Sequence, residues 1–284
     1  MEFDIRKDLS IIKAELDISN NDLAEALNIS ISSFSKLING KEIPSLETLE
    51  RVYSFASNNN IDLNKVKLTY LEPFKPLYFH GSKDGITGLL SLDKSSIRND
   101  FGKGFYLGDN YEQSLDFIAN SHEGSIYVFN AKLNNLNIIS YEVDSTWMLT
   151  ILLNRGMLEK YSDTKLYKQL KSKVDSADVV IAPIADNRMY TIMRLFSENL
   201  MPLRKAYNLL AKLNVGNQYV FKTQKSLDAL KEIDHLFVSK IEKQQSYSRK
   251  IIEEQESIKR LEEDKTKFDP NDKYIEELFK QWKR

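Results

Sequence analysis

Apolar residues recur at helical spacing in three short stretches near the start of the chain, over 19–27, 31–39 and 44–53. Ser19 is a favourable N-cap residue for the first stretch, and Gly40 follows the second as a residue that ends helices. The turn between the first two stretches is only a few residues long. This pattern predicts a small all-helical domain over residues 1–60, followed by a polar linker at 57–65.

The middle of the chain, residues 67–242, mixes short apolar runs with amphipathic stretches. The expected strands lie at 77–80, 125–133, 136–139, 179–182, 218–222 and 236–241, and the expected helices at 111–119, 145–158, 188–198 and 203–213. The alternation is too irregular for a doubly wound parallel sheet, and no glycine-rich loop with nucleotide-fold spacing follows the first strand. We therefore predict a multi-domain chain with an α+β second domain.

Residues 243–284 are rich in Glu, Lys, Gln and Ser, with few apolar positions before Pro270. This composition predicts a charged helical tail, with a short docking helix at its end. Contact with a partner protein is the alternative use of this tail.

Composition narrows the class of protein. The chain has 284 residues, 40 basic and 41 acidic side chains, and no cysteine, which excludes disulfides and thiolate metal sites. His122 and His235 have no clustered carboxylate or second histidine at ligand spacing, so no metal site is expected. The sequence contains neither a signal peptide nor a long apolar run, and we expect a cytoplasmic protein without membrane contact.

The two short helices, together with the following "NGKEIPSLETL", resemble the helix-turn-helix of the Cro/XRE repressor family. In that family the second helix enters the major groove of DNA and its first residues face base edges. The resemblance implies operator DNA as a partner, with homodimers on two half-sites. The DNA-binding residues that it implies here are Ser32, Ser33, Ser35 and Lys36.

The net charge of this first domain argues against DNA binding. Residues 1–57 contain six Lys or Arg and ten Asp or Glu, a net charge of −4, whereas DNA-binding domains usually carry a basic surface. A helical unit that docks another protein is therefore an alternative to DNA binding.

Glycine is concentrated in one region, because six of the ten glycines lie between Gly81 and Gly108. The blocks "YFHGS" and "DFGKGFYL", with "DVVIAPIADNRMY" and "NQYVFKTQKSLDAL" further on, resemble ADP-ribosyltransferases of the His-Tyr-Glu type, and more closely the related bacterial domain-of-unknown-function family 3990. The resemblance covers residues 77–241 and implies NAD as the substrate, without a metal.

The resemblance also implies roles for individual residues. His80 would bind a ribose hydroxyl, Gly81 would pair with the nicotinamide carboxamide, and Ser82 adds a hydroxyl. Tyr106 would stack on nicotinamide, with Tyr111 as a second aromatic wall. The residues before Tyr106 complete the cofactor-binding set, namely Gly104 and Phe105.

The third motif departs from the family pattern, because Gln218 stands where a catalytic glutamate is usual. An amide can bind a ribose hydroxyl but cannot act as a base or supply negative charge. Three explanations are open. Asp186 supplies the carboxylate while Arg188 binds the pyrophosphate, or the acceptor is itself nucleophilic, or the domain binds NAD without turnover.

The resulting hypothesis is an NAD-dependent ADP-ribosyltransferase that modifies a cellular macromolecule, joined to a helix-turn-helix that binds DNA or regulates its own operon. By analogy of architecture, the setting would be toxin-antitoxin or phage defence, with an antitoxin protein as a further partner. The alternative is an XRE-family transcriptional regulator whose second domain senses a nucleotide without catalysis.

Overall fold

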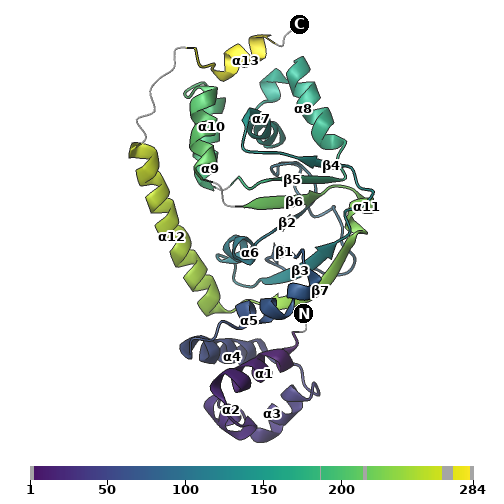
Figure 1. The fold of residues 1–284 in the computed structure, drawn as a ribbon, viewed down its shortest axis with the longest axis vertical. Coiled ribbons are helices and arrows are strands. Elements are labelled where there is room, and N and C mark those ends of the chain that lie inside the picture. The colour runs from purple at the N-terminus through teal and green to yellow at the C-terminus, as the bar shows by residue number, and fades with distance from the viewer. Residues whose placement is uncertain (1–2, 186, 214–215, 264–270, 282–284) are drawn as a thin grey trace. The chain divides into compact units, whose positions relative to one another are not determined.

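The computed structural model describes residues 3–185, 187–213, 216–263 and 271–281 (Figure 1). Two compact units share the chain, and each is built from several segments. The first unit contains Met1–Ile86, Ser114–Asn130 and Glu232–Ser248, and the second contains Thr87–Gln113, Ala131–Lys231 and Arg249–Arg284. The predicted domain boundaries at 60, 67 and 242 stay a prediction.

The N-terminal region is entirely helical, as the sequence predicted. Its helices are α1 (Ile5–Leu16), α2 (Asn20–Ala26), α3 (Ile31–Ile38), α4 (Leu46–Asn58) and α5 (Leu63–Tyr70). The predicted N-cap at Ser19 is confirmed, and it forms a capping box with Asp22. The linker predicted at 57–65 is wrong, because α4 continues to Asn58 and Asp62 caps α5 directly afterwards.

The first unit also contains three strands, in the order β1-β3-β7. They are β1 (Tyr78–Ser82), β3 (Ser125–Ala131) and β7 (Leu230–Phe237). Strand β1 is antiparallel to β3, with His80 opposite Tyr127 and Gly81 opposite Ile126. The strand expected at 236–241 is misplaced, since β7 ends at Phe237 and helix α12 (Lys240–Glu263) begins three residues later.

One hydrophobic core joins the N-terminal helices to the end of β7. Leu9, Leu23, Phe34 and Val52 are buried in it, and Phe237 belongs to the same cluster. The Phe237 ring packs edge-on against Tyr53, with 5.0 Å between ring centroids. The core of the helix-turn-helix region is thus completed by a side chain almost 200 residues further along the chain.

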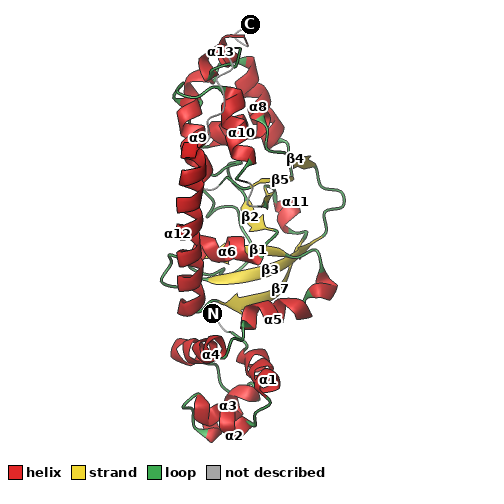
Figure 2. Cartoon of the chain, turned by 60° about the vertical axis from the view of Figure 1, so that its left-hand side comes forward, coloured by secondary structure: helices red, strands yellow, loops and turns green. Residues whose placement is uncertain are grey.

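In the second unit the strand order is β4-β5-β6-β2. The strands are β2 (Phe105–Gly108), β4 (Ile138–Ser140), β5 (Val179–Pro183) and β6 (Asn217–Phe221). The β4 and β5 strands are parallel, whereas β6 is antiparallel to both β5 and β2. The helices, shown in red in Figure 2, are α7 (Ser145–Asn154), α8 (Lys165–Asp175), α9 (Asn187–Ser197), α10 (Leu203–Ala211), α11 (Gln224–Leu227) and α13 (Ile275–Gln281).

The remaining elements are α6 (Tyr111–Ile118) and two single-turn 3-10 helices, Glu72–Phe74 and Glu159–Tyr161. The core of the second unit is built around Trp147, Phe196 and Val220, which are fully buried. Helix α13 docks into this core through Ile275 and Phe279, and the Phe279 ring stacks on Tyr161 at 4.1 Å between centroids. The strands and helices together make a mixed α and β domain after the helical N-terminal region. Within the described residues, no helix is long and apolar enough to span a membrane.

Candidate functional site

Helix α3 presents a polar face to solvent while its apolar face is fixed in the core. Phe34 and Leu37 are buried, whereas Ser32, Ser35 and Lys36 are exposed, and Ser33 is half-buried. The Ser30 side chain accepts a hydrogen bond from the Ser33 backbone N–H and so caps the helix. The four residues predicted to contact DNA therefore lie on one short helix, three of them open to solvent.

The turn between α2 and α3 is held by an arginine from α4. Asn28 adopts a left-handed backbone conformation with φ of 51°. The Arg51 guanidinium donates to the carbonyl oxygens of Leu27 and Asn28, at 3.2 and 3.0 Å, and to Glu47 at 2.8 Å. These bonds tie α4 to the turn that connects α2 to α3.

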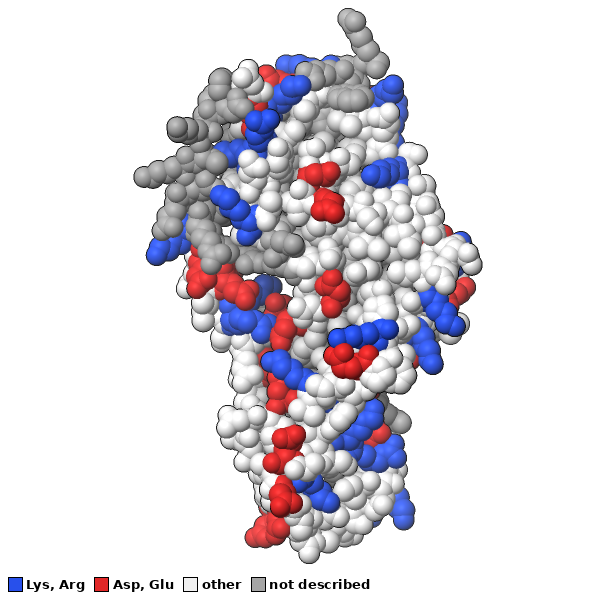
Figure 3. All heavy atoms as spheres, viewed as in Figure 1, with Lys and Arg blue, Asp and Glu red and all other residues white. Residues whose placement is uncertain are grey.

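The face of the protein shown in Figure 3 carries charges of both signs. On the face shown in Figure 3, acidic and basic side chains of the described residues are interspersed. Such a surface gives weak long-range attraction for DNA, so contacts by α3 itself would have to supply most of the affinity.

The His-Gly-Ser block forms β1, in the first unit. His80 and Ser82 are half-buried, and Gly81 is buried. A Cβ atom built on Gly81 would lie 2.5 Å from the Ser114 carbonyl oxygen and 3.1 Å from Ile118 Cγ2, both on α6. The close approach of this helix to β1 is therefore one physical reason for glycine at position 81.

The second block forms β2, in the second unit. A Cβ atom on Gly104 would lie 2.5 Å from Val220 Cγ1 on the neighbouring strand β6, so close strand packing requires glycine there. Phe105 and Tyr111 are buried. The Tyr106 hydroxyl donates to the Gly102 carbonyl at 2.7 Å and accepts from the Phe101 N–H at 3.1 Å, and burial raises its pKa far above the ordinary value. This hydroxyl stays protonated and holds the glycine-rich turn.

Gln218 lies on β6 opposite Gly108 of β2, and it is 7% exposed. Its Nε2 donates to Asp100 Oδ2 at 3.0 Å and to the Pro183 carbonyl at 3.2 Å. Arg155 forms an ion pair with the same Asp100 carboxylate through Nε, at 2.8 Å. The Arg155 guanidinium also lies 5.3 Å from the centre of the Tyr190 ring.

Asp100 and Arg155 were missed by the sequence analysis, although Asp100 opens the glycine-rich stretch. They bring a carboxylate next to the amide of Gln218, and the Asp100 side chain is only 12% exposed. The side chains of two other predicted site residues are not described by the structure. Asp186 lies outside the described residues, and Arg188 falls in α9, where its side chain is not described.

Within the second unit, Phe105, Tyr106 and Gln218 lie on the paired strands β2 and β6, and Gly104 directly precedes β2. His80, Gly81 and Ser82 come together on β1 of the first unit. Among the described residues, no group of three or more His, Asp or Glu side chains is arranged to hold a metal ion.

These features define a protein with an N-terminal helix-turn-helix and a mixed α and β domain. A family model described as "Protein of unknown function (DUF3990)" matches residues 77–232, and the chain belongs to this family. A second model, described as "Helix-turn-helix" (HTH_3), matches residues 10–52 and indicates DNA binding or regulation. No curated protein and no solved structure matches the chain.

Proposed function

We propose that this chain is a DNA-binding regulator that contacts duplex DNA through α3 and binds a nucleotide of the NAD type in its DUF3990 domain. The observation that supports DNA binding is the exposed set of Ser32, Ser35 and Lys36 on a helix whose other face is buried in the core. Short hydroxyl side chains and one lysine suit contacts to base edges and phosphates.

A DNA-selection experiment tests this function. A duplex selected from a random-sequence library by the full chain should bind the Lys36→Ala variant about tenfold more weakly, with a salt slope smaller by about one. Ser32→Ala should instead relax the selected sequence. Lys168→Ala, which removes an exposed lysine from α8, is the matched control and should change neither quantity.

Two results would contradict DNA binding. Either no sequence is enriched, or the affinity of the chain for DNA is the same in the wild type and Lys36→Ala. Binding of a protein with little salt dependence would favour the alternative that the acidic N-terminal helices dock a partner.

The proposed nucleotide binding by the DUF3990 domain has two forms, with and without catalysis. In the catalytic form the domain transfers ADP-ribose from NAD. The observation that favours it is the Asp100 carboxylate, 3.0 Å from the Gln218 amide that replaces the usual glutamate. Cleavage of the bond between nicotinamide and ribose develops positive charge on the sugar, and a nearby carboxylate stabilises such charge. The bonds that already occupy Gln218 and Tyr106 favour the other form, a domain that binds the nucleotide without turnover.

Nicotinamide release separates the two forms. If the domain is a transferase, the purified chain with cell lysate should release nicotinamide from NAD. Asp100→Asn should lose at least about 90% of the rate, since removing one charge-stabilising group typically costs about 10²-fold or more. His80→Ala should also lose at least about 90% of the rate, because it removes the side chain expected to position the ribose. If the domain is a sensor, NAD should bind without release, and the DNA affinity should change when NAD is added. Absence of NAD binding to the wild-type chain would exclude both forms.

A further inference from the structure

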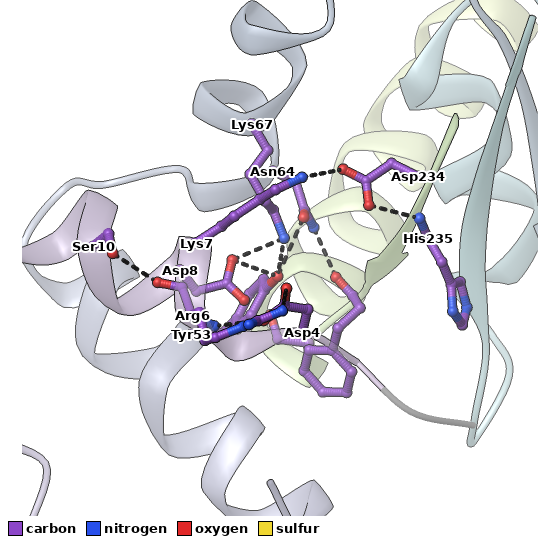
Figure 4. Close-up of polar contacts among 12 residues, drawn as sticks. Asp4, Arg6, Lys7, Asp8, Ser10, Tyr53, Asn64, Lys67, Asp234 and His235 are labelled. Carbon is purple, nitrogen blue, oxygen red and sulfur yellow. Dashed lines mark hydrogen bonds and ion pairs between the residues drawn. The ribbon is translucent and has the colours of Figure 1, made fainter. Parts of the chain in front are cut away.

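A buried polar network runs through the first unit, beside the core that holds the N-terminal helices together (Figure 4). Asp8 on α1 is 2% exposed, and its Oδ1 lies 2.8 Å from Lys67 Nζ on α5. The Tyr53 hydroxyl of α4 accepts a hydrogen bond from Lys67 and lies 3.3 Å from both Asp8 Oδ1 and Asn64 Oδ1. The network therefore ties together three helices of the N-terminal region.

Asn64 extends the network to the junction between β7 and α12. Its Nδ2 donates to the Phe237 carbonyl and to Glu242 Oε1, both at 2.8 Å, and the residue is fully buried. Glu242 Oε2 in turn accepts from the Ser239 backbone N–H at 3.0 Å and from the Ser239 hydroxyl at 2.8 Å. The same junction also contributes the Phe237 ring to the helical core.

Two further contacts bind the same two regions at the surface. The Lys240 N–H donates to Glu50 Oε2 on α4 at 3.0 Å, and Lys7 Nζ on α1 lies 3.4 Å from Asp234 Oδ2 on β7. His235, next to Asp234, stacks on Tyr127 of β3 with 4.1 Å between centroids. The junction is thereby connected both to the N-terminal helices and to the strands of the unit.

Removing Lys67 or Asn64 from the buried part of the network would leave another buried group without its hydrogen bond, which is costly. Helices α1, α4 and α5 therefore cannot separate from the β7–α12 junction without breaking Asn64 and Glu242 contacts and exposing Phe237. Local opening in proteins follows such contiguous cooperative units.

We propose that the helix-turn-helix and the β7–α12 junction, residues Glu232–Glu242, unfold locally as one cooperative unit. Binding of DNA to α3 and local unfolding of the junction are then linked. By linkage, whatever stabilises the junction also stabilises the DNA-binding helices, and DNA on α3 protects the junction by the same factor. The link to DNA depends on the proposed function, whereas the shared opening of the two segments does not.

Native-state hydrogen exchange in increasing urea, on the full chain without DNA, tests the shared opening. Backbone amides of α4 and α5 and those of Leu236 and Phe237 should exchange through one opening, with the same free energy and the same urea dependence. In Asn64→Leu the α4 and α5 amides should exchange through an opening of their own. Their exchange should be at least about tenfold faster than that of the junction amides, because loss of one network contact typically changes coupling by about that factor.

Asn58→Leu makes the same change at an exposed position of α4 and should leave the common opening intact. Two results would overturn the proposal. One is an opening of α4 and α5 in the wild type that leaves Leu236 and Phe237 protected, and the other is an Asn64→Leu variant with the wild-type exchange pattern.

A second arm adds the DNA duplex selected by the chain. Exchange at Leu236 and Phe237 should slow in the wild type and stay unchanged in Asn64→Leu. If no duplex is selected, the proposed function fails while the shared opening is still decided by the first arm. If a duplex binds and the junction is unaffected, the linkage to DNA is wrong.

Discussion

Replacement of Lys67 by methionine is expected to lower the free energy of unfolding by about 3 kcal/mol at pH 7, because it leaves a buried carboxylate without its cation. Asp8 is 2% exposed, and its Oδ1 lies 2.8 Å from Lys67 Nζ. Methionine keeps the length and the apolar part of the lysine side chain, so the lost charge dominates the change. Urea unfolding followed by circular dichroism measures it.

The loss should also depend on pH with a definite sign. Burial raises the pKa of Asp8 above 3.8, and Lys67 opposes that rise. Without Lys67 the folded-state pKa rises further, so the folded state binds a proton more tightly than the unfolded chain. The destabilisation is then largest above the folded pKa and diminishes as the pH falls toward 3.8.

Two variants control this prediction. Lys65→Met removes an exposed lysine from the same helix, which forms an ion pair with Asp62 at 3.0 Å, and should cost less than about 0.5 kcal/mol. The double variant Asp8→Asn with Lys67→Met should recover part of the loss, because it removes the unpaired charge. A loss for Lys67→Met that is equal at all pH values would contradict the role of the ion pair.

Local signals predicted the helix-turn-helix well. Ser19 as an N-cap, the short turn before α3 and the burial of Phe34 and Leu37 all follow from side chains within a few residues of each other. The polar stretch at 57–65 was misread because Asn64 looks like a surface residue, whereas it is buried and bonded to the distant Phe237 carbonyl.

The strand error near the end of the family domain has a different cause. The apolar run after Leu236 favoured a strand to Ile241, but Ser239 and Glu242 form a capping box that starts α12. The spacing Ser-x-x-Glu is a signal of a helix start, so the sequence did contain the evidence. Strand β2 was missed because it is four residues long and flanked by glycines.

The contacts at Gln218 were beyond the reach of sequence reasoning. The pairs Gln218–Asp100 and Arg155–Asp100 join residues 118 and 55 positions apart, with no local pattern to indicate them. The glycines had a more ordinary explanation than expected, since Gly81 and Gly104 admit a helix and a neighbouring strand. Their predicted contact with NAD stays a prediction.

Gln218→Glu, which introduces the residue usual in the ADP-ribosyltransferases that the sequence resembles, is expected to destabilise the chain by about 2–4 kcal/mol at pH 7. The amide of Gln218 donates to Asp100 Oδ2 and to the Pro183 carbonyl, and a carboxylate would turn both contacts into repulsion between acceptors. The Asp100 carboxylate is also ion-paired with Arg155 and only 12% exposed, so two carboxylates would face each other in a largely buried site.

Thermal and urea unfolding of Gln218→Glu should show this loss. The loss should diminish as the pH falls and the added carboxyl takes up a proton, because the protonated form no longer repels Asp100. Gln169→Glu adds the same charge at an exposed position of α8 and should leave stability unchanged. A stable Gln218→Glu variant that releases nicotinamide faster than the wild type would show that Gln218 occupies a vacant catalytic position. A destabilised variant would instead indicate that this family member uses the amide to position Asp100, which makes Asp100 the carboxylate to follow in any search for activity.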